Sequence, residues 1–255
     1  MTNPGSTQTP GPPANPSGKA GAAISSETPE FLKAEFQLIE HMRESLVNLV
    51  NQRFNFLLAL VSATLVAISF LGNELHFSSV FFLVASGLLV SVLMLGLIVF
   101  ARALEAEVMT IIYIRALNRI RNYFVTNDPT IRQYLTMPWY DDVPSLYAPG
   151  YDLSKAGGSW WTKFTNVPAM VAVINSTLVS FLGVSLSQFV ALLDSNTSGS
   201  AGEPLPYIIL SALVGIVSFA AALYLQLKRI VTRLTQATAK FHVHFKTTRA
   251  EDTPQ

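Results

Sequence analysis

Four long apolar stretches without a charged residue constrain this chain more than any other feature of its sequence. They cover about residues 54–72, 78–101, 169–193 and 205–227, and none contains Asp, Glu, Lys, Arg or His. A membrane-spanning helix needs roughly 20 mostly apolar residues, and a soluble helix is rarely uncharged over such a length. Strands of a membrane barrel are about half as long and alternate in polarity. The sequence therefore predicts an all-α, polytopic membrane protein with four transmembrane helices.

The composition agrees with this class. Only 13% of the residues are charged, against about 25% in a typical soluble domain. The 17 Lys and Arg nearly balance the 16 Asp and Glu, so no surplus of charge indicates a nucleic-acid partner, and none is expected. The chain contains no cysteine, which excludes disulfide scaffolds, thiolate metal sites and cysteine nucleophiles.

The distribution of cations predicts the orientation of the helices. All 17 Lys and Arg lie before residue 54, between residues 102 and 163, or after residue 227. The connections 72–78 and 193–206 contain none. By the positive-inside rule, both termini and the middle segment are cytoplasmic. We expect a multi-pass protein of the plasma (inner) membrane.

Six segments follow from these patterns. Residues 1–27 form a disordered tail rich in Pro, Gly and Ser, and residues 28–53 form a cytoplasmic amphipathic helix. Residues 54–101 and 169–227 are the two transmembrane hairpins. Residues 102–168 hold a cytoplasmic helix that stops at Asp128-Pro129 and a loop rich in aromatic residues, Pro and Gly. Residues 228–255 are a basic tail, helical over about 228–246.

Small and amide residues in the spans are the first candidates for function. The third span carries a one-sided row of small residues at Ser176, Ser180, Gly183 and Ser187. Such rows usually allow close helix packing, and the alternative is a polar pore lining. Asn175 and Gln188 in that span predict interhelical hydrogen bonds, with ligand or ion coordination as the alternative.

A polar face also leads into the first span. It comprises His41, Glu44, Asn48, Gln52 and Asn55 and continues into Ala59 and Ser62. Two interpretations stay open. The face can be simply solvated or hydrogen-bonded to neighbouring helices, or it can form the polar vestibule of an oligomeric pore.

Membrane lipids are the expected partners of residues at the membrane boundary. Arg229 and Arg233 lie one helical turn apart directly after the fourth span, where anionic headgroups attract cations. Trp160 and Trp161 precede the third span and suit the headgroup level, where amphipathic rings settle.

No catalytic or metal-binding motif occurs in the chain, so we expect no enzyme, cofactor or metal. Asp141-Asp142 predicts a solvated turn, with cation binding as the alternative. On a helix, His242 and His244 would point in opposite directions and could not chelate one metal. On a strand they could, but two imidazoles fall short of a normal ligand set.

A membrane hairpin flanked by long cytoplasmic helices resembles, in layout, the small pore-forming effectors of prokaryotic conflict systems called SLATT proteins. The stretch from Glu35 through Phe56, with Arg53 and Asn55 at the membrane entry, carries the resemblance. Those proteins usually have one hairpin, whereas this chain has two, and no diagnostic motif accompanies the layout. The chain is therefore not assigned to that family.

The sequence thus favours a non-enzymatic, homo-oligomeric membrane anchor or scaffold whose cytoplasmic helices bind a protein partner. The alternative is an oligomeric ion channel or pore-forming effector lined by the Ser-rich third span. A coupled transporter is disfavoured, because such proteins place acidic residues or His within their spans.

Overall fold

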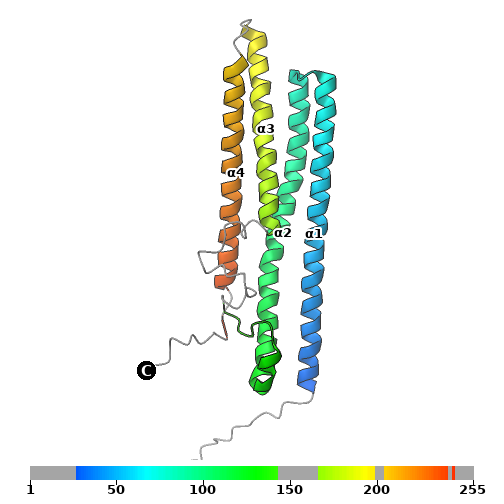
Figure 1. Cartoon of the computed structure of the whole chain (residues 1–255), viewed down its shortest axis with the longest axis vertical. Coiled ribbons are helices and arrows are strands. Elements are labelled where there is room, and N and C mark those ends of the chain that lie inside the picture. The colour runs from blue at the N-terminus through cyan, green and yellow to red at the C-terminus, as the bar shows by residue number, and fades with distance from the viewer. Residues whose placement is uncertain (1–26, 143–165, 199–203, 241–242, 245–255) are drawn as a thin grey trace, which may run out of the picture.

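A computed structural model of the chain describes residues 27–142, 166–198, 204–240 and 243–244. Within these ranges the chain is helical and has no strand. It forms α1 (Glu27–Leu75), α2 (Ser79–Asn127), the short 3-10 helix η1 (Pro129–Tyr134), α3 (Val167–Ser198) and α4 (Pro204–Lys240) (Figure 1). The four α-helices are long and apolar enough to cross a membrane, which confirms the predicted all-helical fold and agrees with a multi-pass membrane protein.

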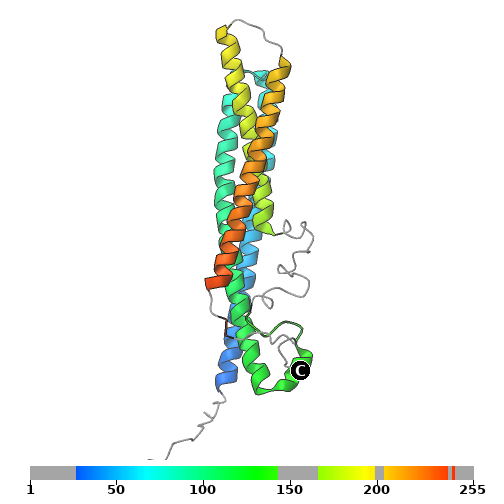
Figure 2. The same cartoon turned by 90° about the vertical axis from the view of Figure 1, so that its left-hand side faces the viewer.

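The helices form an up-and-down bundle in which each helix packs on the next one along the chain (Figures 1 and 2). α2 and α3 lie between α1 and α4. The α1–α2 hairpin extends well beyond the start of α3 (Figure 1). We call this extension, residues 27–53 of α1 with residues 102–127 of α2, the stalk. A helix of 49 residues is about 74 Å long, more than twice the thickness of a bilayer core.

A tight turn joins α1 to α2. His76 and Phe77 both have positive φ values, 48° and 53°, which reverse the chain within two residues. The absence of a side chain on Gly72 leaves room for the Phe77 ring, which also packs edge-on against Phe81 at 5.1 Å between ring centroids. The hydroxyl of Ser78 caps α2 by accepting a hydrogen bond from the Phe81 N–H.

The end of α2 matches the prediction, whereas the end of α4 does not. Asp128 stops α2: its N–H donates to the Phe124 carbonyl, and its side chain accepts from the Thr130 N–H before η1 begins. The helix predicted over 228–246 ends at Lys240. His244 lies outside it because its N–H donates to the Asp141 carboxylate at 3.0 Å and not to a helical carbonyl.

Two apolar regions hold the bundle together. In the upper region, α1, α2 and α3 bury residues that pack closely, and residues of α4 pack against them: Leu57, Phe100, Leu104, Val171 and Ala172 form one cluster, and Leu89, Val92 and Leu178 another. In the stalk, Ile39 of α1 packs against Leu117 and Ile120 of α2. The stalk is therefore a packed helix pair with its own small core.

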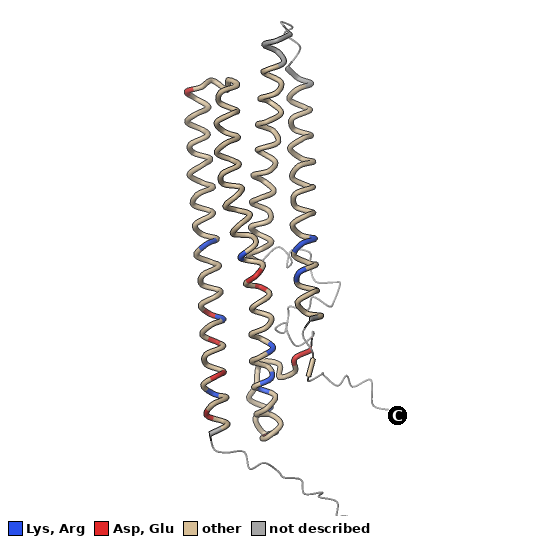
Figure 3. Tube along the Cα trace, turned by 180° about the vertical axis from the view of Figure 1, so that it is seen from behind, with Lys and Arg blue, Asp and Glu red and all other residues tan. Residues whose placement is uncertain are grey.

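Charged residues divide the bundle along its length. Every Lys and Arg in the described part of the chain lies toward the stalk end, and the opposite half is almost free of charge (Figure 3). This division matches the boundaries of the apolar stretches in the sequence.

Candidate functional site

The small-residue face of the predicted third span lies largely within the bundle. Ser176 is fully buried and donates its hydroxyl to the Ala172 carbonyl at 2.7 Å. A Cβ on Gly215 of α4 would lie 3.1 Å from the Ser180 hydroxyl. A Cβ on Gly183 would lie 3.1 Å from the hydroxyl of Ser218, also on α4. This close approach of α3 and α4 supports the packing interpretation of the row.

Ser187 continues the same row toward the end of α3. It is half-buried and donates its hydroxyl to the Val184 carbonyl at 2.8 Å. Its hydrogen-bonding capacity is therefore partly satisfied by its own helix.

The two span amides have the interhelical partners that the sequence predicts. Asn175 is fully buried, and its Nδ2 donates to Oε1 of Gln226 on α4 at 3.3 Å. Gln188 donates to the hydroxyl of Ser211, also on α4, at 2.9 Å. These bonds link α3 to α4 at two different depths of the bundle.

A third polar contact links α3 to α2. The hydroxyls of Ser86 and Ser185 lie 2.9 Å apart, and Ser185 also bonds the Phe82 carbonyl at 3.1 Å. α3 therefore forms interhelical hydrogen bonds with both α2 and α4, as expected for polar groups that have no water to bind.

Asn175 makes a further contact that the sequence does not reveal. Its Oδ1 is buried without a hydrogen-bond partner and lies against the backbone of Gly96 on α2. Any side chain at Gly96 would overlap that oxygen. The lack of a side chain at Gly96 therefore leaves the space that the Asn175 amide occupies.

The sequence does not predict the polar junction that forms around Asp141, between the stalk and the end of α4. Asp141 is fully buried and accepts a hydrogen bond from Arg119 Nε at 2.8 Å, in addition to the bond from the His244 N–H. Arg115 is only 3% exposed and donates to the Thr238 carbonyl near the end of α4. Asp141 is thus not the solvated turn residue that the sequence predicts, because Arg119 neutralises it. These contacts tie α2 to the loop after η1 and to the end of α4.

Glu107 lies on α2 just beyond the apolar stretch and faces a small cavity of about 50 Å³ between the stalk helices. Asn51 and Thr110 line the same cavity. Burial raises the pKa of the Glu107 carboxyl above its usual value. Glu105, two residues earlier, is instead exposed and pairs with Arg102 at 2.9 Å.

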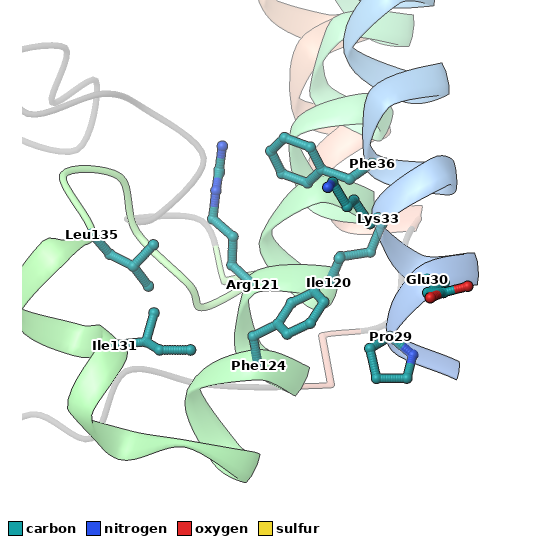
Figure 4. A pocket seen from close by; sticks show the side chains of 9 residues that line it. All are labelled: Pro29, Glu30, Lys33, Phe36, Ile120, Arg121, Phe124, Ile131 and Leu135. Carbon is teal, nitrogen blue, oxygen red and sulfur yellow. The ribbon is translucent and has the colours of Figure 1, made fainter. Parts of the chain in front are cut away.

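An open apolar groove lies at the far end of the stalk, where α1, α2 and η1 meet. Its volume is about 460 Å³, within the range of pockets that bind small ligands or side chains. Ile131 and Leu135 form one wall and face Ile120 and Phe124 across the opening (Figure 4).

Charged groups border this groove on the α1 side. Lys33 and Glu30 contribute to its lining together with Phe36, and the Arg121 guanidinium lies 5.4 Å from the centre of the Phe36 ring. Arg121 also donates to Oδ1 of Asn118 at 2.8 Å, which fixes its position. The groove therefore combines an apolar floor with two cations and one carboxylate.

The polar face leading into the first span is exposed along its whole length. His41, Glu44, Asn48, Gln52 and Asn55 are all exposed, and so are Ala59 and Ser62. Within the chain, the other helices leave this face uncovered, and both interpretations of it stay open.

The predicted lipid-contacting residues divide into two groups. Arg229 and Arg233 are exposed on α4. Neither forms an ion pair with another residue of the described part. Trp160 and Trp161 lie outside the described residues.

No cluster of three or more His, Asp or Glu side chains within the described ranges is arranged to hold a metal ion. Comparison with protein-family models, curated proteins and solved structures finds no significant match.

Proposed function

We propose that this chain is a non-enzymatic membrane scaffold whose stalk binds a protein partner in the cytoplasm. The main support for this proposal is the groove at the far end of the stalk. An apolar concavity there faces water, and exposed apolar surfaces of this kind mark interaction sites. The four apolar helices supply the anchor.

The groove suits a short apolar segment of a partner, such as one face of an amphipathic helix. Helix-in-groove recognition places a few apolar side chains in a cleft of this size. Lys33 and Arg121 at its border favour a partner that carries a carboxylate beside those apolar residues.

Site-specific photo-crosslinking in native membranes tests this proposal. A photoreactive residue at Lys33 is expected to give a discrete adduct with one protein. Ile131→Asp with Leu135→Asp should abolish the adduct, because two carboxylates remove the apolar wall of the groove. Both residues lie outside the stalk core cluster, so the stalk should stay folded.

A photoreactive residue at exposed Glu105 serves as the control, since it lies far along α2 from the groove. It should give no such adduct. The absence of any adduct from Lys33, or an adduct that survives both aspartates, counts against the groove as a docking site.

An oligomeric channel is the second candidate, favoured by the exposed polar face of α1. Several copies could place Asn55 and Ser62 around a common axis. Ion flux through liposomes tests this function, and Asn55→Leu should abolish the flux while leaving the packed interior intact. Ser180→Leu is a poorer probe, because Ser180 packs against Gly215. Flux that Asn55→Leu leaves unchanged, or no flux at all, favours the scaffold.

The proposed orientation places the stalk and both termini in the cytoplasm of a cell with a plasma (inner) membrane. It rests on the concentration of cations at the stalk end (Figure 3). In this orientation Arg229 and Arg233 meet the anionic leaflet. Replacing both by Gln should reduce the anionic lipid that co-purifies with the protein, most strongly at low salt. Unchanged lipid content would argue against this contact.

A further inference from the structure

The outer wall of the groove belongs to a segment with almost no apolar anchor of its own. η1 and the loop after it, residues 129–142, supply Ile131 and Leu135 to the groove (Figure 4). We call this stretch the wall segment. η1 buries none of its residues, and over the described range 129–142 only Asp141 is buried. A segment without buried apolar side chains opens at little cost in free energy, so the position of the wall depends on its polar contacts.

The start of the wall segment is fixed by Asp128, the residue that stops α2. Its carboxylate accepts from the N–H of Thr130 at 3.0 Å and from the Thr130 hydroxyl at 2.6 Å. This cap sets where the segment leaves the helix. A segment held only there could still swing about that point, so the contacts at its far end decide where the wall lies.

The far end of the wall segment is held at Tyr140 and Asp141. Asn118 of α2 is fully buried and donates its Nδ2 to the Tyr140 carbonyl at 2.8 Å. Arg119 Nε donates to the Asp141 carboxylate at 2.8 Å. The N–H of His244 donates to the two oxygens of the same carboxylate at 3.0 and 3.2 Å. The far end is therefore held from two sides, by α2 and by the chain that follows α4.

Asn118 also joins this far end to the groove itself. Its Oδ1 accepts from Arg121 at 2.8 Å, and the guanidinium of Arg121 lies 5.4 Å from the centre of the Phe36 ring in the groove lining. One buried amide thus contacts both the wall segment and a cation at the border of the groove. Buried hydrogen bonds of this kind are directional and favour a single arrangement of the groups that they join.

We propose that His244 is a positioning residue: its backbone N–H holds Asp141, and with it the wall segment, so that the chain after α4 regulates the groove. This inference rests on the proposed partner binding and adds its control. A groove that is formed for only part of the time binds its partner more weakly, in proportion to the fraction formed. Displacing His244 from Asp141 therefore weakens partner binding without touching any residue that lines the groove.

Distances between two spin labels test the position of the wall. The chain has no cysteine, so labels can be attached at Gln37→Cys on α1 and Gln133→Cys on η1, two exposed positions. His244→Pro removes the N–H that donates to Asp141, and the distance between the labels should become longer and its distribution broader. His244→Gln keeps the backbone N–H and a polar side chain, so it should leave the distance unchanged.

A second pair of labels separates a movement of the wall from a loosening of the stalk. Gln37→Cys with Asn127→Cys joins α1 to the last residue of α2, and both positions are exposed. Their distance should not change in His244→Pro, because the core of the stalk does not include the wall segment. A change of both pairs would mean that the stalk itself has loosened, and would overturn the proposal.

Photo-crosslinking from Lys33 connects the wall to partner binding. His244→Pro should reduce the yield of the adduct several-fold, whereas His244→Gln should retain it. If the wild type gives no adduct, the proposed partner binding fails, and the label distances still decide whether His244 holds the wall. An unchanged distance between Gln37 and Gln133 in His244→Pro, an equal change in His244→Gln, or a full yield of adduct from a displaced wall contradicts the inference.

Discussion

At the scale of single residues, Gly96 is the clearest case of a position fixed by its neighbour. The oxygen of Asn175 occupies the space where a side chain would begin. Gly96→Ala should therefore force α2 and α3 apart or displace the amide, at a cost of about 1–3 kcal/mol. We expect a lower midpoint of thermal unfolding in detergent.

Gly87 on the same helix is the matched control, because a Cβ there would meet nothing within 4 Å. Gly87→Ala should leave the midpoint unchanged or raise it slightly, since Ala favours a helix over Gly. Equal effects of the two substitutions would show that Asn175 does not restrict position 96.

Glu107 provides a prediction about pH. Burial raises its pKa in the folded chain, so the stability linked to this group is fully present below the ordinary value of 4.5. That stability falls as the pH rises through the raised pKa, when a carboxylate must be held in a poorly hydrated cavity. Glu107→Gln should therefore raise the unfolding midpoint at pH 8.

The difference between Glu107→Gln and the wild type should shrink as the pH is lowered and vanish below 4.5, where both side chains are neutral. A gap that is constant with pH would mean that the charge of Glu107 is not the cause.

The residues differ in how far the sequence could reveal their roles. An amide in an apolar span needs a partner, so the bonds of Asn175 and Gln188 were predictable in kind. The role of Gly96 was not predictable, because a glycine in a helix does not show which side chain of another helix occupies the space beside it. The helix itself follows from the apolar pattern alone.

At the scale of elements, the polar junction of the stalk ties together α2, the loop after η1 and the end of α4. Arg119 and Asp141 are 22 residues apart, and Asp141 and His244 are 103 apart. Sequence patterns reveal neighbours within a helix, so they predict a solvated turn at Asp141 and do not connect it with Arg119. Only the fold brings them together, and burial then replaces water with an ion pair.

Asp141→Ala should release His244, which follows the end of α4, and remove the carboxylate that accepts from Arg119. We expect a loss of about 1–3 kcal/mol in local stability, because a buried group loses its hydrogen bonds. Hydrogen exchange should become faster at the His244 N–H and at the last turn of α4. Exchange in α3 should not change, and a uniform increase over the whole chain would instead indicate global destabilisation.

At the scale of the whole molecule, the arrangement separates packing within the chain from surfaces left for other molecules. α3 has its small residues and amides engaged by α2 and α4, whereas α1 has one face uncovered over its full length. The sequence contains both the small-residue row of α3 and the polar face of α1, but it does not show which of them packs within the chain. A row of small residues looks the same whether it meets a helix of its own chain or of another copy, and the bundle order decides between these possibilities.

The orientation of this bundle in the membrane is the last prediction. The connection between α1 and α2 has no cation, whereas the stalk has many, and moving that charge across a bilayer is unfavourable. Glu74→Cys places a thiol at the end of α1, and Glu105→Cys places one on α2 just beyond its apolar stretch; both positions are exposed. A membrane-impermeant maleimide should label Glu74→Cys on intact cells and Glu105→Cys only after permeabilisation. The reverse pattern would put the groove and the basic end of α4 outside the cell, where neither a cytoplasmic partner nor the anionic inner leaflet could reach them.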